Sequence, residues 1–214
     1  MATRHYPVLR PSRHWQRTGT ATSHLHVIHM QLGFKHVNND PTSFRPPDQT
    51  MKIPVFVSCP TSLSKDQEAN RGIVCDMLAS LNLEPRALGR TDYPANFPLR
   101  EVLVIARHCA GGVILGFNQF TATAGTWKPR TKDESPLAGT AKFPTAWNHL
   151  ETGILFSLGR PLLVFREDGI SGGVFDPGVT DVFVHKMPNP KGNKGELREV
   201  FLKWRDKVGS VYYA

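Results

Sequence analysis

From residue 53 onward the chain alternates short apolar runs with longer amphipathic ones, and this pattern constrains the fold most. Residues 53–58 are rich in β-forming side chains and precede a turn-forming stretch, Cys59-Pro60-Thr61-Ser62. Residues 66–82 place apolar side chains at helical spacing, which predicts an amphipathic helix. The alternation of strand and helix is typical of an α/β domain.

The remaining expected elements continue the alternation. Pro98 opens a helix, since proline is well tolerated at a first helical position. Residues 113–117 are apolar throughout, as in a strand buried on both faces. We expect further strands at residues 86–88, 160–165 and 179–185, and helices at residues 99–109, 144–158 and 195–208. Five strands alternating with helices predict a doubly wound, mainly parallel sheet of flavodoxin-like order 2-1-3-4-5.

Two segments do not follow the alternation. Residues 118–143 are polar and without periodicity, which predicts a long loop of a functional or mobile kind. Residues 1–50 hold 6 Lys/Arg and 2 Asp/Glu, so half of the net charge of +8 lies there. We interpret them as a disordered or spurious N-terminal extension, with Met51 as a candidate true start and 51–214 as the domain. A basic arm that binds nucleic acid is the weaker alternative.

Several function classes lack their signals. The three cysteines form no CxxC pair, which argues against a disulfide framework or a structural zinc site, and we expect no metal. No P-loop, GxGxxG or GxSxG motif is present, and we expect no bound cofactor. No apolar run is long enough for a membrane span and no secretory signal begins the chain, so we expect a cytoplasmic protein without membrane contact.

In doubly wound sheets, ligands bind beyond the carboxyl ends of the strands. That edge would gather residues 58–62, 92–94 and 117–120 with the start of the helix at Pro144. Five residues at this edge, outside that helix, are therefore candidates for substrate contact: Ser58, Pro60, Thr61, Asp92 and Phe117. Asp92 could equally stabilise a turn, and Phe117 could simply end a strand.

The helix over residues 144–158 carries one unusual carboxylate. Trp147, Leu150, Ile154 and Leu158 recur at helical spacing and predict its buried stripe. Glu151 falls at the margin of that stripe, where a carboxylate is costly unless it is paired or useful. Position alone gives similar weight to a structural glutamate paired with arginine and to a functional one.

This segment resembles two related groups of proteins. TIR domains carry Ser-x-Trp-Cys-x-x-Glu; Thr145, Trp147 and Glu151 stand at that spacing, with Asn148 in place of the cysteine. Nucleoside 2-deoxyribosyltransferase-like proteins continue from the glutamate as Glu-x-Gly-x-x-x-x-x-Gly-[KR]-Pro, which matches the run from Glu151 to Pro161. Those transferases usually have aspartate where this chain has Thr145, so the likeness is nearer to a TIR-like domain of bacterial type.

The resemblance implies cleavage of an N-glycosidic bond in NAD or a related nucleotide, as in an NAD glycohydrolase or cyclase, with Glu151 as the catalytic group. It also implies self-association into a homo-oligomer and a role in anti-phage defence. Trp147 would line the pocket, although a core tryptophan is the alternative. Arg90, Lys128 and Arg130 are candidates for phosphate contact, although solvated loop charges are the usual case. A non-catalytic nucleotide-binding or signalling module of the same fold is the alternative function.

Overall fold

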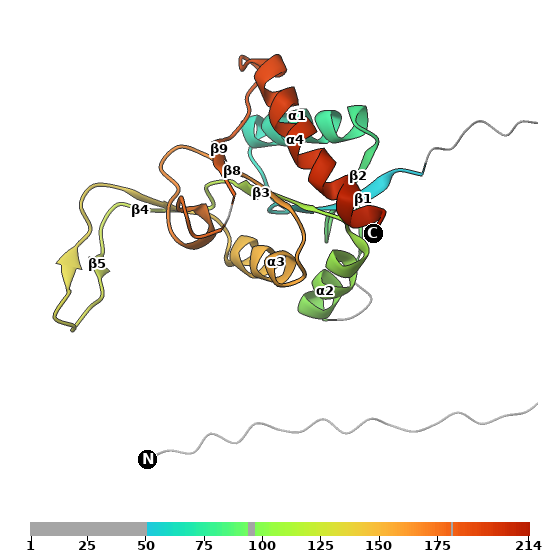
Figure 1. Ribbon diagram of the computed structural model, residues 1–214. Helices are drawn as coiled ribbons and strands as arrows, with labels where there is room; N and C mark the ends of the chain where they lie inside the picture. Colours follow the sequence, from blue (N-terminus) through green and yellow to red (C-terminus); the bar gives the residue numbers. More distant parts are fainter. Residues whose placement is uncertain (1–50, 94–96, 181) are drawn as a thin grey trace, which may run out of the picture. The chain divides into compact units, whose positions relative to one another are not determined.

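The computed structural model describes residues 51–93, 97–180 and 182–214 (Figure 1). The interpretation of residues 1–50 therefore lies outside the described residues. A five-stranded sheet has the order β2-β1-β3-β8-β9 with every neighbouring pair parallel, which confirms the predicted flavodoxin-like topology. Its strands are β1 (Ile53–Ser58), β2 (Leu83–Arg86), β3 (Gly112–Gly116), β8 (Leu162–Arg166) and β9 (Val184–Lys186).

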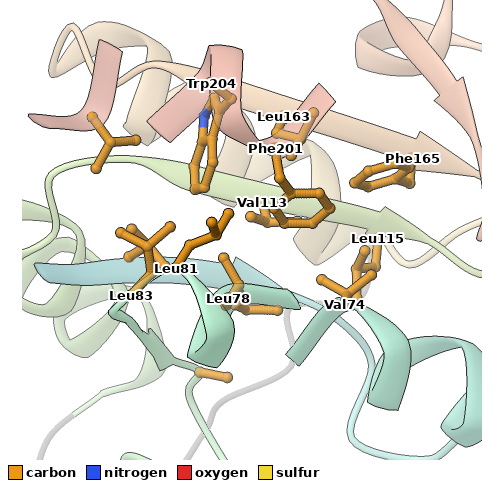
Figure 2. Close-up of a cluster of buried hydrophobic side chains, with 14 of the residues drawn as sticks. Val74, Leu78, Leu81, Leu83, Val113, Leu115, Leu163, Phe165, Phe201 and Trp204 are labelled. Carbon is orange, nitrogen blue, oxygen red and sulfur yellow. The ribbon is translucent and has the colours of Figure 1, made fainter. Parts of the chain in front are cut away.

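Helices cover both faces of this sheet. On one face lie α1 (Lys65–Ser80) and α4 (Lys194–Tyr212), and on the other lie α2 (Pro98–His108) and α3 (Ala146–Ser157) (Figure 1). Two apolar cores result, one on each face. Figure 2 shows the first, where Phe201 and Trp204 of α4 and Leu78 of α1 meet Val113 of β3. The core on the other face joins α2 and α3 to side chains such as Ile114 of β3.

Local sequence signals explain where the helices begin. Ser64 and Gln67 form a capping box that starts α1, each side chain bonding the other residue's backbone N–H. Pro98 occupies the first position of α2, as expected. Thr145 caps α3 by accepting a hydrogen bond from the N–H of Asn148. These caps satisfy donors that would otherwise lack partners at the helix ends.

The two edge strands were located less well than the central ones. A strand was expected at residues 86–88, whereas β2 ends at Arg86 and pairs Leu83 with Ile53. Pro85 has no backbone N–H to donate. It is tolerated in β2 because β2 is an edge strand with a partner on one side only. β9 overlaps only the last two residues of the expected 179–185 run and continues to Lys186. A short 3-10 turn at Gly173–Phe175 precedes that run in the connection from β8.

Residues 118–143 form a ribbon, so the expectation of a structureless loop is wrong. Its base pairs β4 (Phe120–Ala122) with β7 (Ala141–Phe143), and its outer part pairs β5 (Thr126–Trp127) with β6 (Ser135–Pro136), all antiparallel. Each strand is only two or three residues long, too short to show a period in the sequence. This arm extends away from the sheet (Figure 1).

The helices in the described part of the chain do not combine the length and hydrophobicity that crossing a membrane requires.

Candidate functional site

A cleft of about 510 Å³ opens at the carboxyl ends of β1, β2 and β3, where a doubly wound sheet was expected to bind its ligand. This volume lies in the range of pockets for small molecules. Its walls come from the loop after β1, the loop after β2, the first turn of α2, the base of the arm and the start of α3. The described lining residues are Cys59, Pro60, Thr61, Ser62, Leu88, Gly89, Pro98, Gln119, Thr145, Trp147 and Glu151.

Helix α3 is rotated about its axis relative to the prediction. Of the expected buried stripe, Ile154 and Leu158 still pack against the core, where they are partly buried. Trp147 and Leu150 were expected in the buried stripe, yet they are 41% and 49% exposed. The buried residues of the helix are instead Asn148, Glu151, Thr152 and Leu155. Polar contacts made by the Asn148 side chain fix this rotation, and hydrophobicity alone does not reveal them.

The rotation places Glu151 inside the cleft. Its side chain lines the cavity, but the residue is only 9% exposed. Burial raises its pKa to about 7, while a hydrogen bond from the Ser58 hydroxyl acts in the opposite direction. None of the ion pairs among the described residues includes Glu151. The alternative of a structural glutamate paired with arginine therefore does not hold in this part of the chain.

Beneath the carboxylate lies a pair of fully buried polar side chains. Ser58 ends β1, and Asn148 lies one turn before Glu151 on α3. The Asn148 amide nitrogen donates to Ser58 Oγ over 2.8 Å and lies 3.4 Å from the backbone oxygens of Ser58 and Leu115. Ser58 was expected to touch substrate; the structure places it behind Glu151 and not among the lining residues.

The loop after β1 is held by Arg90, which was considered for phosphate contact. Its guanidinium donates to the carbonyl oxygens of Pro60 and Thr61 and to the Glu68 carboxylate, at 2.8 to 3.1 Å. The arginine therefore shapes the wall of the cleft. Pro60 and Thr61 lie in that wall, as the sequence suggested.

The structure separates two further candidates from the cleft. Asp92 bonds the Arg86 guanidinium and the Thr91 hydroxyl, and it faces a different hollow beside α2. Phe117 is fully buried in the core between the sheet, α1 and α4, and has no surface on which a base could stack. The two corrections have different causes: Asp92 is paired with Arg86, and Phe117 is buried in the apolar core.

Trp147 does line the cleft, so the alternative of a core tryptophan is wrong. Gln119 also lines the cleft; it lies in the expected edge segment 117–120 but was not named as a candidate. Sequence reasoning missed the inward amide of Asn148. The available signal for Asn148 was its place one helical turn before Glu151, on the same face. The cleft holds no cluster of metal ligands: among the described residues, no group of three His, Cys, Asp or Glu side chains could hold an ion.

Comparison of the whole chain with models of protein families, with curated proteins and with solved structures finds no match in any of the three.

Proposed function

We propose that this protein cleaves the N-glycosidic bond of NAD or a related nucleotide, with Glu151 as the catalytic carboxylate. The observation that carries the proposal is the placement of Glu151, buried at the edge of a ligand-sized cleft and outside every described ion pair. A carboxylate without a cationic partner, at the switch point of a doubly wound sheet, is a functional-site candidate.

The chemistry needs a single carboxylate. As the bond between ribose C1′ and the pyridinium nitrogen breaks, its electron pair goes to nicotinamide, which leaves neutral and needs no proton. The ribose becomes an oxocarbenium-like cation. Ionised Glu151 stabilises that cation by its charge or by a transient ester. Water then adds to C1′ and loses a proton, or a second nucleophile of the nucleotide adds in its place.

The cleft supports a role for Trp147 beside this carboxylate. The ring lies half exposed in the wall, one helical turn from Glu151. A base or nicotinamide ring could stack on it, and such stacking is worth about 1–3 kcal/mol per base. Self-association and a part in anti-phage defence belong to the same proposal. A rate that rises more than linearly with protein concentration would support the former.

The test is incubation of the full chain with NAD at high protein concentration, followed by chromatographic separation of the products. We expect nicotinamide release that is lost in Glu151→Gln. The second product then distinguishes hydrolysis from cyclisation.

The matched control is Glu167→Gln. That glutamate lies at the same sheet edge, but it bonds Gln67 and the N–H of Asn118 and does not line the cleft. Its variant should keep the activity. Release that survives Glu151→Gln would overturn the proposal. Binding of NAD in a thermal-shift assay without any release would favour the non-catalytic module.

A further inference from the structure

A second hollow lies at the carboxyl ends of β8 and β9. Its volume is about 350 Å³, which is within the range of small-molecule pockets. Its walls come from α1, β8, β9, the first half of α4 and the loop between β9 and α4. The hollow therefore lies on the sheet face that α1 and α4 cover, and it shares no described lining residue with the cleft at Glu151. It is called the distal hollow below.

The inner part of the distal hollow is lined by rings and aliphatic side chains. Phe165 of β8 is 1% exposed and stacks on Phe201 of the core, with 5.8 Å between the ring centroids (Figure 2). The ring of His185 on β9 lies 5.6 Å from that of Phe165. Ile73 of α1 and Val200 of α4 add apolar surface. A flat ring placed here gains contact with other rings and loses its exposure to water.

The imidazole of His185 adds a polar group to this wall. It is half-buried and makes no hydrogen bond to any of the described residues. Burial lowers its pKa, so the ring is mostly neutral at pH 7. A neutral imidazole has one nitrogen that donates and one that accepts, and both are open to a ligand in the hollow.

The mouth of the distal hollow carries more positive than negative charge. Lys186 and Lys194 line it and are exposed, and the acidic residue in the described lining is Glu196. None of the ion pairs among the described residues includes either lysine. The two ammonium groups are therefore available to an anionic group at the mouth.

The rim of the distal hollow is ordered by the chain itself. The N–H of Met187 donates to the carbonyl oxygen of Arg166 over 2.8 Å, and the N–H of Gly192 donates to that of Asn189 over 2.9 Å. The side chain of Asn193 caps the first turn of α4. These bonds fix the loop between β9 and α4 without a ligand, as in pockets that are largely preformed.

We propose that the distal hollow binds a small aromatic anion, with its ring against Phe165 and His185 and its carboxylate or phosphate group near Lys186 and Lys194. The ring matches the apolar interior, and the anionic group matches the charge of the mouth. This inference is independent of the proposed function, because the two sites lie on opposite faces of the sheet.

The test compares small probes that separate the ring from the charge. Indole-3-acetate and phenyl phosphate each combine a ring with an anionic group. Tryptamine carries an ammonium group on the same indole ring, and acetate carries the anionic group without a ring. Binding to the full chain is followed in 15N–1H correlation spectra, in which the backbone signals of residues 186–197 report on the hollow.

We expect at least one of the two aromatic anions to shift these signals with a dissociation constant of about 1 mM, as probes of this size allow. Tryptamine and acetate should bind at least about five times more weakly. The tighter of the two aromatic anions shows whether a carboxylate or a phosphate is preferred. The proposal is overturned if neither shifts these signals at ten times the expected constant, or if tryptamine or acetate binds as tightly.

Variants then locate the bound probe. Lys186→Gln and Lys194→Gln should each weaken the binding by about two- to fivefold, the size of an exposed ion pair, and should fold normally because both side chains are exposed. Val200→Phe fills the hollow and should abolish the binding.

The matched control is Lys203→Gln. Lys203 is exposed on the same helix as Lys194 but does not line the distal hollow, so its variant should bind as the wild type does. Equal weakening in Lys194→Gln and Lys203→Gln would show an effect of net charge alone and overturn the proposal. Undiminished binding in both Lys186→Gln and Lys194→Gln would also overturn it, whether or not Val200→Phe folds.

Discussion

At the scale of single residues, the site depends on the carboxylate of Glu151, whose burial destabilises the folded protein. Glu151 is the only carboxylic acid, and no basic side chain is present, among the described residues that line the cleft. A carboxylate with so little exposure is retained only at a cost in stability, because burial disfavours its charged form. Its elevated pKa converts this cost into a measurable dependence of stability on pH.

The first prediction concerns Glu151→Gln. Because burial raises the carboxyl pKa from about 4.5 to about 7, the native state binds more protons than the unfolded state between these values. The wild type should therefore lose about 3 kcal/mol of stability as pH rises through this window, with no further loss from this group above it. The glutamine variant should lack that loss.

Urea unfolding of both proteins at pH 4.5 and pH 8 measures the difference. The variant should gain stability relative to the wild type at pH 8 by more than at pH 4.5. Equal differences at the two values would mean that the Glu151 pKa is not elevated.

At the scale of elements, alanine substitutions at two glycines, one in β3 and one in α3, should change stability in opposite directions. Gly116 lies in β3, and a Cβ added there would lie 2.5 Å from a ring carbon of the buried Phe175. Gly153 lies in α3, and a Cβ there meets nothing within 4 Å. The first position needs glycine for packing, whereas the second weakens a helix without a steric reason.

We therefore expect Gly116→Ala to destabilise the protein by about 1–3 kcal/mol through overpacking. Gly153→Ala should stabilise it by about 0.5–1 kcal/mol through helix propensity. Denaturant unfolding of the two variants beside the wild type checks both signs. A destabilised Gly153→Ala would show that this side of α3 is covered in the protein in solution.

The arm gives a second prediction at this scale. Ala122 and Ala141 are directly paired, so an Asn-Gly turn can join them in place of residues 123–140. The removed residues are almost all exposed, with Trp127 against Phe143 the one ring contact described for them. The shortened protein should lose less than about 1 kcal/mol in the same unfolding experiment. A larger loss would show that the outer ribbon stabilises the domain.

The bounds of most helices and strands could be predicted from the sequence, but the side of a helix that packs against the sheet could not. β1 was placed at its observed bounds, and the sheet order followed from alternation together with the rules of chain connection. The rotation of α3 could not be predicted, because the bond between Asn148 and Ser58 joins residues 90 positions apart. The strands of the arm could not be predicted either, because two or three residues are too few to show the alternation of apolar and polar side chains that is typical of a strand. Glu151 was found through a motif and its place on the sheet edge.

At the scale of the whole molecule, the described core draws on residues from Ile53 to Val208. Its five parallel strands require crossover connections, so each pair of neighbouring strands joins distant parts of the sequence. The described core therefore spans most of the length of residues 51–214.

We therefore expect residues 51–214 to unfold at the same temperature as the full chain, followed by circular dichroism and by tryptophan fluorescence. The truncated protein should also elute earlier from a cation exchanger, since its net charge falls from +8 to +4. A lowered melting temperature would mean that residues 1–50 stabilise the domain.

The closed base of the arm has a practical consequence. The backbone N–H of Gln119 donates to the carbonyl oxygen of Phe143 over 2.9 Å, so the chain leaves and re-enters the domain at nearly the same point. Gln119 also lines the cleft. A fluorescent reporter or a small folded module spliced between Ala122 and Ala141 would thus be joined to the domain through the paired strands next to the cleft wall. The protein offers a ready scaffold for a sensor whose signal changes when the cleft fills.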